Sequence, residues 1–229
     1  MNILNIFIGY DSAAPVLYNV AQHSIHSRTK SQCIVRPLIL DQLKTIYSRS
    51  PHQLASTEFS FSRFLVPYLS GYQGWSLFMD NDVVVLDDIQ NIFDLADDTF
   101  SVMCVKHEHE PKDTKKFLGK TQTSYEKKNW SSFLLFNNSK CKALTPEYVE
   151  NASGLELHQF HWLDSEDLIG SIPISWNYLA GYSNRGLSKD DIQMIHYTDG
   201  APCYDGYEDS EDSEIWLKEK ESMINNQKK

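Results

Sequence analysis

The chain has 229 residues, 41% of them hydrophobic and 23% charged, which is typical of a globular protein large enough for one sizeable α/β domain or two small ones. Its net charge of −10 argues against nucleic acid or an anionic membrane as a partner, because both bind basic surfaces. No internal repeat or linker is visible, so we expect a single domain over residues 1–229.

Cysteine usage and the absence of a leader bear on the compartment. The four cysteines have neither CxxC nor zinc-finger spacing, so we expect them to be reduced. The chain starts directly with the apolar run 3–8, without a basic leader, and has no run long enough to span a bilayer. These features predict a cytoplasmic protein without a transmembrane segment.

The first forty residues predict a β-α-β unit. Residues 3–8 are short, apolar and β-branched, as in a buried strand. Pro15 suits the start of a helix that continues to about Ser27. Residues 33–40 indicate a second strand, in which Pro37 favours an edge position. Such a unit is the building block of a parallel sheet.

The rest of the chain continues the alternation of strands and helices. Apolar residues recur at helical spacing between Thr57 and Leu69, and a strand is expected from Trp75 to Met79. Further strands are expected at 83–86, 100–105, 132–136, 172–176 and 194–197, helices at 89–95, 146–149 and 214–223, and a long polar loop at 107–128. We therefore predict an α/β fold with a Rossmann-like mixed, mainly parallel sheet flanked by helices.

The segment Asp80-Asn81-Asp82 separates two of the strand-like runs. Carboxylates at the end of a buried strand are unfavourable unless positive charge meets them. A divalent cation supplies that charge and can also hold a diphosphate, and oxygen ligands favour Mg²⁺ or Mn²⁺ over zinc. The alternative is an ordinary turn at a strand end, where Asp and Asn are common.

Three other features could carry chemistry. His196 follows an apolar run and could supply a third metal ligand, or be a structural histidine. Gly9-Tyr10-Asp11 ends the first strand, where α/β sheets bind nucleotides, although there is no GxGxxG or Walker lysine. Arg63 could pair with a phosphate or with a core carboxylate. The cluster 107–110, with alternating His and Glu, is interpreted as a solvated loop.

Five segments, taken in order, resemble the glycosyltransferase family 8-like group of nucleotide-diphospho-sugar transferases, which has the GT-A fold. They are Phe7-Ile8-Gly9-Tyr10-Asp11, Thr57–Phe64, Phe78-Met79-Asp80-Asn81-Asp82, Ser131–Asn137 and Ile195–Gly200. The resemblance covers nearly the whole chain, and it is specific as a set although no single piece is. It implies one GT-A domain with a nucleotide-binding half at about 1–105 and an acceptor and metal-closing half at about 106–229.

The resemblance also implies roles for individual residues. Asp80 and Asp82 match the DxD motif that holds Mn²⁺, or Mg²⁺, against the donor diphosphate, and His196 matches the C-terminal metal-binding histidine. Residues implied to contact the nucleotide-sugar are Phe7, Gly9, Tyr10, Asp11, Arg63, Asn81, Ser131, Ser132 and Gly200. The acidic residues implied to lie near the donor sugar and the reaction centre are Asp164, Glu166 and Asp167.

The implied activity is transfer of a sugar from a nucleotide-diphosphate donor, UDP-sugar being favoured, to an unknown saccharide or other acceptor, with retention at the anomeric carbon. The family's His motif normally continues to a lysine that contacts the diphosphate, but residues 200–204 contain none. Either Arg63, Arg185 or Lys189 replaces that lysine, or the donor is bound differently. Two rivals stay open: a degenerate, non-catalytic nucleotide-sugar-binding protein, and a nucleotidyltransferase, for which the loop at 9–12 lacks the expected glycine-rich basic character.

Overall fold

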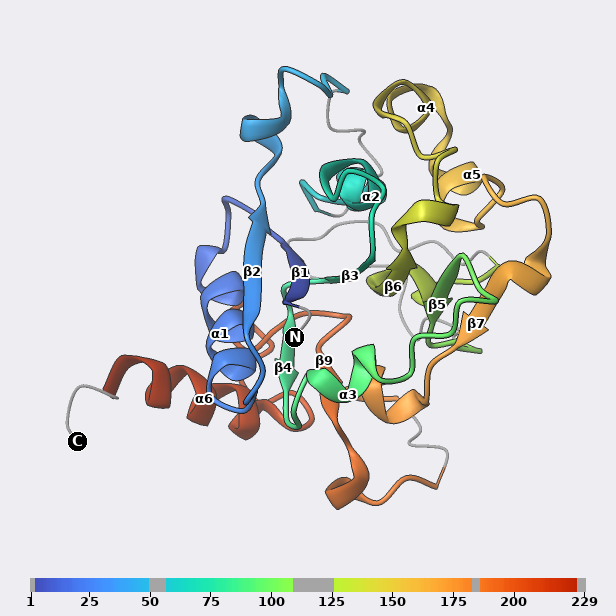
Figure 1. Ribbon diagram of the computed structural model, residues 1–229. Helices are drawn as coiled ribbons and strands as arrows, with labels where there is room; N and C mark the ends of the chain where they lie inside the picture. Colours follow the sequence, from blue (N-terminus) through green and yellow to red (C-terminus); the bar gives the residue numbers. More distant parts are fainter. Residues whose placement is uncertain (1–2, 50–56, 109–125, 183–185, 226–229) are drawn as a thin grey trace.

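The computed structural model describes residues 3–49, 57–108, 126–182 and 186–225 (Figure 1). Two sheets organise these residues, one with six strands and one with three. Within the described ranges, no helix combines the length and the apolar character needed to cross a bilayer.

The large sheet has the strand order β2-β1-β3-β6-β5-β7. Its strands are β1 (Leu4–Gly9), β2 (Cys33–Leu38), β3 (Trp75–Met79), β5 (Val102–Cys104), β6 (Phe133–Asn137) and β7 (Ile169–Ser171). The pairs β1-β2, β1-β3 and β5-β7 are parallel, whereas β6 is antiparallel to both β3 and β5. All strands except β6 therefore share one direction, which confirms the predicted mixed, mainly parallel sheet.

The small sheet continues directly from the large one. Strand β4 (Val83–Val85) pairs antiparallel with β9 (Met194–His196), which pairs parallel with β8 (Tyr178–Leu179). Only residues 80–82 separate the end of β3 from the start of β4. The chain thus crosses from the large sheet to the small sheet within the Asp80-Asn81-Asp82 segment.

Helices cover both faces of the large sheet (Figure 1). The α-helices are α1 (Pro15–His26), α2 (Val66–Leu69), α3 (Gln90–Phe93), α4 (Pro146–Asn151), α5 (Gly154–His158) and α6 (Ser213–Asn225). Short 3₁₀ helices are η1 (Leu40–Leu43), η2 (Ser62–Leu65), η4 (Trp130–Ser132), η5 (Asn138–Lys140), η6 (Glu166–Leu168), η7 (Ile174–Asn177) and η8 (Lys189–Asp191). Helices α2, α4 and α5 contribute to the core on one face, and α1 and the small sheet to the core on the other.

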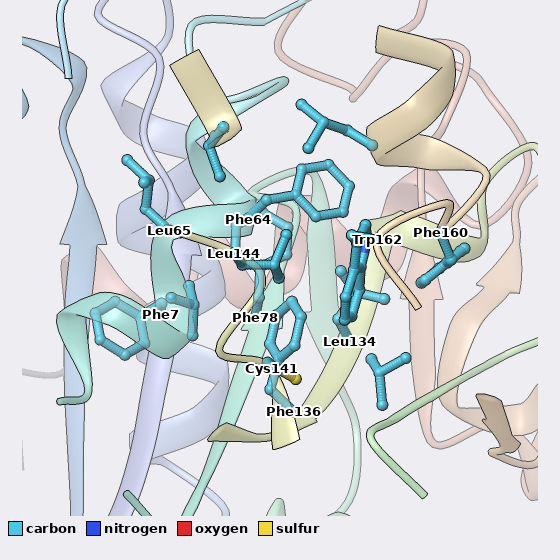
Figure 2. Close-up of a cluster of buried hydrophobic side chains, with 14 of the residues drawn as sticks. Phe7, Phe64, Leu65, Phe78, Leu134, Phe136, Cys141, Leu144, Phe160 and Trp162 are labelled. Atoms are coloured by element: carbon cyan, nitrogen blue, oxygen red, sulfur yellow. The ribbon is translucent and has the colours of Figure 1, made fainter. Parts of the chain in front are cut away.

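The alternation of side chains along the strands divides the core between these two faces. Phe7, Phe78 and Phe136 point into the cluster beneath α2, α4 and α5, which Figure 2 shows in close-up. Their strand neighbours, among them Ile8 and Leu77, point into the opposite cluster with α1 and the small sheet. Because successive side chains of a strand face opposite sides, both faces of these strands are apolar and buried. The continuous apolar runs in the sequence have this cause.

The predicted β-α-β unit is confirmed as β1, α1 and β2, with Pro37 on the edge strand β2. The helix expected from Thr57 to Leu69 was wrong in its first part: residues 57–61 are not helical, and the 3₁₀ helix η2 leads directly into α2, which ends at Leu69. Pro67 lacks an N–H, so it cannot complete an uninterrupted helical ladder. The strand expected at 172–176 was also wrong: it is β7 at Ile169–Ser171 that pairs with β5, and the chain after Pro173 forms η7.

Candidate functional site

Asp80, Asp82 and His196 come together at the junction of the two sheets. One ligand atom from each of the three lies within 4.8 Å of the others. Asp82 Oδ1 lies 3.3 Å from His196 Nε2. The structure thus brings His196 to Asp80 and Asp82, which precede it by more than a hundred residues, as the sequence predicted.

Backbone hydrogen bonds hold both aspartates. Asp80 N–H donates to the Ser132 carbonyl at 2.9 Å and extends the β3-β6 ladder by one step. Tyr197 N–H donates to the Asp82 carbonyl, also at 2.9 Å, and extends the β4-β9 ladder. Each carboxylate is therefore carried on backbone that belongs to a different sheet.

The donor set fits a divalent cation. Two ligands at right angles around an ion with bonds of about 2.1 Å lie about 3.0 Å apart, close to the 3.3 Å between Asp82 Oδ1 and His196 Nε2. The two carboxylates suit Mg²⁺ or Mn²⁺, and of these two ions the imidazole favours the transition metal Mn²⁺, with remaining positions open to water or to the oxygens of a ligand. The alternative of a simple polar turn at 80–82 does not account for the convergence of His196 from another strand.

Arg63 contacts this group through Asp80. Its guanidinium forms an ion pair with Asp80 at 2.8 Å and donates to the Ser131 carbonyl at 2.8 Å. The charge lies 4.9 Å from the centre of the Phe78 ring and 5.4 Å from that of Phe59, and the residue is only 5% exposed. Of the two partners left open by the sequence, a phosphate or a core carboxylate, this structure pairs Arg63 with the carboxylate.

Two polar residues that the sequence did not single out support the site. Asn177 lies 2.9 Å from His196 Nδ1 through its Oδ1, and its Nδ2 donates to Ser132 Oγ at 2.9 Å. His158 Nδ1 lies 2.6 Å from Ser131 Oγ. Burial, reinforced by the positive charge of Arg63, lowers the pKa of His158 to about 3, so this imidazole is neutral at physiological pH.

The predicted nucleotide segment lies beside Asp80, Asp82 and His196, the candidate metal ligands that we call the metal group. Parallel pairing aligns Ile8 with Met79, so Gly9 at the end of β1 is next to Asp80 at the end of β3. A Cβ on Gly9 would lie 2.4 Å from the Phe59 ring, which explains the glycine by packing. The Asp11 carboxylate is buried and accepts a hydrogen bond from Ala13 N–H at 3.0 Å, which holds the loop that follows.

The remaining predicted contacts of the nucleotide-sugar are mostly buried. Phe7 belongs to the core cluster beneath α2, and its ring lies 5.4 Å from the Arg36 guanidinium carbon. Asn81, Ser131 and Ser132 are each less than 5% exposed. Tyr10, in contrast, is half-buried and its ring lies 5.9 Å from that of Tyr18.

In the segment after His196, the structure explains Gly200 but does not identify the cation that would replace the missing diphosphate-binding lysine. A Cβ on Gly200 would lie 2.7 Å from the Tyr207 ring, so that ring requires the glycine. Burial raises the pKa of Tyr204, and the charges of Cys203 and Asp82 raise it further. Lys189, one candidate for the missing lysine, pairs with Asp212 at 2.6 Å. Arg185 lies outside the described residues.

The acidic residues Asp164, Glu166 and Asp167 are exposed and precede β7. Strand β7 is separated from β3 by β6 and β5, and the three residues do not join the group of Asp80, Asp82 and His196. Glu166 instead forms an ion pair with Lys127, and Asp167 accepts a hydrogen bond from Ser165 Oγ. A role near the donor sugar stays a prediction for them.

The sheet order and the helices on both faces define the GT-A fold of glycosyltransferases. Solved structures share it. WbbM, a bifunctional glycosyltransferase, matches with a TM-score of 0.65 and 12% sequence identity, over 95% of this chain and 49% of WbbM. GlyE of Streptococcus pneumoniae matches with a TM-score of 0.61 and 15% identity, over 99% of this chain and 63% of GlyE, and the galactosyltransferase LgtC with a TM-score of 0.61 and 11% identity, over 96% of both chains. The chain thus spans about half of WbbM and less than two thirds of GlyE. LgtC was solved with donor and acceptor sugar analogues.

At the level of sequence, the chain is 46% identical to Protein CDI of Arabidopsis thaliana over 231 residues, which cover 98% of this chain and 88% of that protein. The chain belongs to the family of Protein CDI. No protein-family profile matches it.

Proposed function

We propose that this protein is a metal-dependent glycosyltransferase of the family 8-like group, which transfers a sugar from a nucleotide-diphosphate donor, with UDP favoured, to a saccharide or other acceptor with retention. The observation that carries the proposal is the group of Asp80, Asp82 and His196 at the junction of the two sheets. In open α/β folds, ligands bind beyond the carboxyl ends of the parallel strands, and Asp80 and Gly9 both lie at such ends.

Each residue has a role in this proposal. Asp80, Asp82 and His196 would hold Mn²⁺ or Mg²⁺, which when bound stabilises the negative charge of the departing diphosphate. Tyr10 and Asp11 would contact the nucleoside, because their loop follows the strand next to Asp80. Arg63 keeps the Asp80 carboxylate in place and provides positive charge on the donor side. We assign no protein nucleophile.

Residues assigned to the donor on resemblance alone complete the proposal. These are Phe7, Gly9, Asn81, Ser131, Ser132 and Gly200, with Asp164, Glu166 and Asp167 nearer the sugar. The proposal also includes a single domain with a nucleotide-binding half at about 1–105 and an acceptor and metal-closing half at about 106–229, the half that supplies His196. A cytoplasmic location is also proposed, supported by four cysteines without disulfides, and imaging of a fluorescent fusion in cells tests it.

Thermal shift measurements with UDP, GDP and CDP, with and without Mn²⁺, test the proposal. A nucleotide that raises the melting temperature only with Mn²⁺ supports a metal-bridged diphosphate. The matched variants are Asp82→Ala, which should abolish the metal-dependent shift, and Asp94→Ala, an acidic residue outside the metal group, which should not.

Slow hydrolysis of nucleotide-sugars distinguishes the enzyme from its rivals. A transferase releases UDP from one sugar of a UDP-sugar panel in a Mn²⁺-dependent manner, and Asp82→Ala loses that activity. Binding of a nucleotide-sugar without turnover of any member of the panel would favour the non-catalytic binding protein. The lack of a lysine at 200–204 is consistent with that alternative. Turnover of a nucleoside triphosphate and a sugar phosphate would favour a nucleotidyltransferase.

A further inference from the structure

Asn177 is a fully buried side chain that connects the two sheets directly behind the metal group. It ends η7, the short helix that precedes β8. On one side its carboxamide meets Ser132, whose carbonyl receives the Asp80 N–H. On the other side it meets the ring of His196, at the end of β9. The Asn177 amide therefore links Ser132, which holds the backbone of Asp80, to the side chain of His196.

The direction of these hydrogen bonds can be derived from their ends. Ser132 Oγ donates its one hydrogen to the Asn129 carbonyl at 2.6 Å, because a carbonyl oxygen can only accept. Ser132 Oγ must then accept from Asn177, so the amide NH₂ faces Ser132 at 2.9 Å. This orientation turns the amide oxygen of Asn177 to the His196 ring.

The amide oxygen in turn determines the tautomer of His196. Asn177 Oδ1 lies 2.9 Å from His196 Nδ1, and since the oxygen can only accept, Nδ1 carries the hydrogen. The lone pair of the neutral ring then lies on Nε2, the atom that faces Asp82 Oδ1 at 3.3 Å. Metal-binding histidines are commonly fixed in this way by a hydrogen bond to their second nitrogen.

We propose that Asn177 is a positioning residue for the metal: through the chain Asn129–Ser132–Asn177–His196 it holds the imidazole in the tautomer and orientation in which Nε2 binds the cation. The inference rests on the proposed function, since it presupposes that Asp80, Asp82 and His196 bind Mn²⁺. Asn177 itself contacts neither the cation nor the donor. Its effect therefore reaches the metal only through His196.

Calorimetric titration with Mn²⁺ alone, on the full chain, tests the inference without requiring a donor. Loss of such a supporting residue typically weakens metal binding by about 10- to 100-fold, and this is the loss expected for Asn177→Ala. Asn177→Asp keeps an oxygen acceptor opposite Nδ1 and should restore most of the affinity. Ser132→Ala removes the acceptor that orients the amide and should give an intermediate loss.

Asn138 provides the matched control. It is also a fully buried asparagine, and its Nδ2 donates to the Gln73 carbonyl at 2.9 Å and to Ser76 Oγ at 2.8 Å, at the opposite end of β3. Asn138→Ala should lower the melting temperature but leave the Mn²⁺ affinity unchanged. Equal Mn²⁺ affinities of Asn177→Ala and wild type would overturn the inference while leaving the proposed function intact. A wild-type protein that binds no Mn²⁺ would overturn both.

Discussion

At the scale of single residues, the charge balance of the metal group depends on Arg63. Its guanidinium is nearly buried between two aromatic rings and pairs with Asp80, whose side chain is 16% exposed. Removing one partner of a buried ion pair leaves the other charge without compensation, which typically costs about 3–5 kcal/mol. The ion pair therefore stabilises the fold as well as the site.

Arg63→Met should accordingly lower the free energy of unfolding by about 3–5 kcal/mol. Mn²⁺ should restore more stability to this variant than it adds to the wild type, because the cation then supplies the missing positive charge next to Asp80. Urea unfolding with and without Mn²⁺ measures both effects. Arg63→Lys, which keeps a charge but not the planar fork, is the control and should lose less. An unaltered unfolding curve for Arg63→Met would refute the first part.

Gly9 gives a second test at this scale. A Cβ on Gly9 would lie 2.4 Å from the Phe59 ring, so Gly9→Ala should destabilise the protein by about 1–3 kcal/mol through overpacking. Phe59→Leu should relieve part of this, so the double variant should lose less than the sum of the single variants. Urea unfolding of the four proteins measures the coupling. Gly71→Asn, at a positive φ that asparagine tolerates better than most residues and with nothing within 4 Å, should lose less stability than Gly9→Ala. Strictly additive losses would contradict the packing explanation.

The sequence revealed the ligands better than their supports. Asp80 and Asp82 stand out because carboxylates interrupt a buried apolar run, and His196 because it ends another run. Asn177 and His158 carry no comparable signal, since a polar residue in a mixed segment has many uses, and only the folded chain brings them to Ser132 and Ser131. The contact with Phe59 that requires a glycine at position 9 could not be predicted either, because only the folded chain brings the two residues together.

At the scale of elements, uninterrupted apolar runs were predictable, whereas two segments that contain a proline were not. The apolar runs of β1, β3 and β6 are buried on both faces, and their hydrophobicity alone indicates strands. The errors at 57–69 and 172–176 both involve a proline, at positions where 3₁₀ turns compete with regular structure. In such short segments tertiary contacts decide, and the local pattern does not record them.

The attachment of α6 to α1 yields a prediction for pH. Glu219 on α6 is largely buried. Its carboxylate lies 2.6 Å from Nδ1 of His23, on α1, and 2.8 Å from Nη2 of Arg28, just after α1. Burial acts to raise the pKa of this carboxyl, but the bonds to Arg28 and His23 outweigh it and the net shift is downward. A pKa lowered by folding adds stability above the unfolded value of about 4.3 and loses it as the pH falls through the folded pKa.

Glu219→Gln should therefore lower the free energy of unfolding at pH 7 by about 1.5–3 kcal/mol, the range for hydrogen bonds to charged groups. The difference from wild type should shrink as the pH falls below about 4.3. Urea unfolding at several pH values measures it. Glu221→Gln, an exposed position on the same helix, is the control and should behave as wild type throughout. A difference that stays constant down to pH 3 would exclude the carboxylate as its source.

At the scale of the whole molecule, the metal group lies where the large sheet and the small sheet meet. Asp80 is held by the large sheet, Asp82 and His196 by the small one. A ligand that binds only the folded protein stabilises it by mass action, by about 1.4 kcal/mol at ten times its dissociation constant. Because all three ligands must be in place at once, this stabilisation should be shared by both sheets.

Mn²⁺ at about ten times its dissociation constant should therefore raise the melting temperature by about 3–6 °C, given about 2–4 °C per kcal/mol for a chain of this size. In hydrogen exchange, amides of β3 and of β9 should both become better protected, since opening either sheet dissociates a ligand. His196→Ala should remove the protection in both sheets together. If it removed the protection of β9 alone while β3 still responded to Mn²⁺, the cation would be bound by the aspartates without coupling the two sheets.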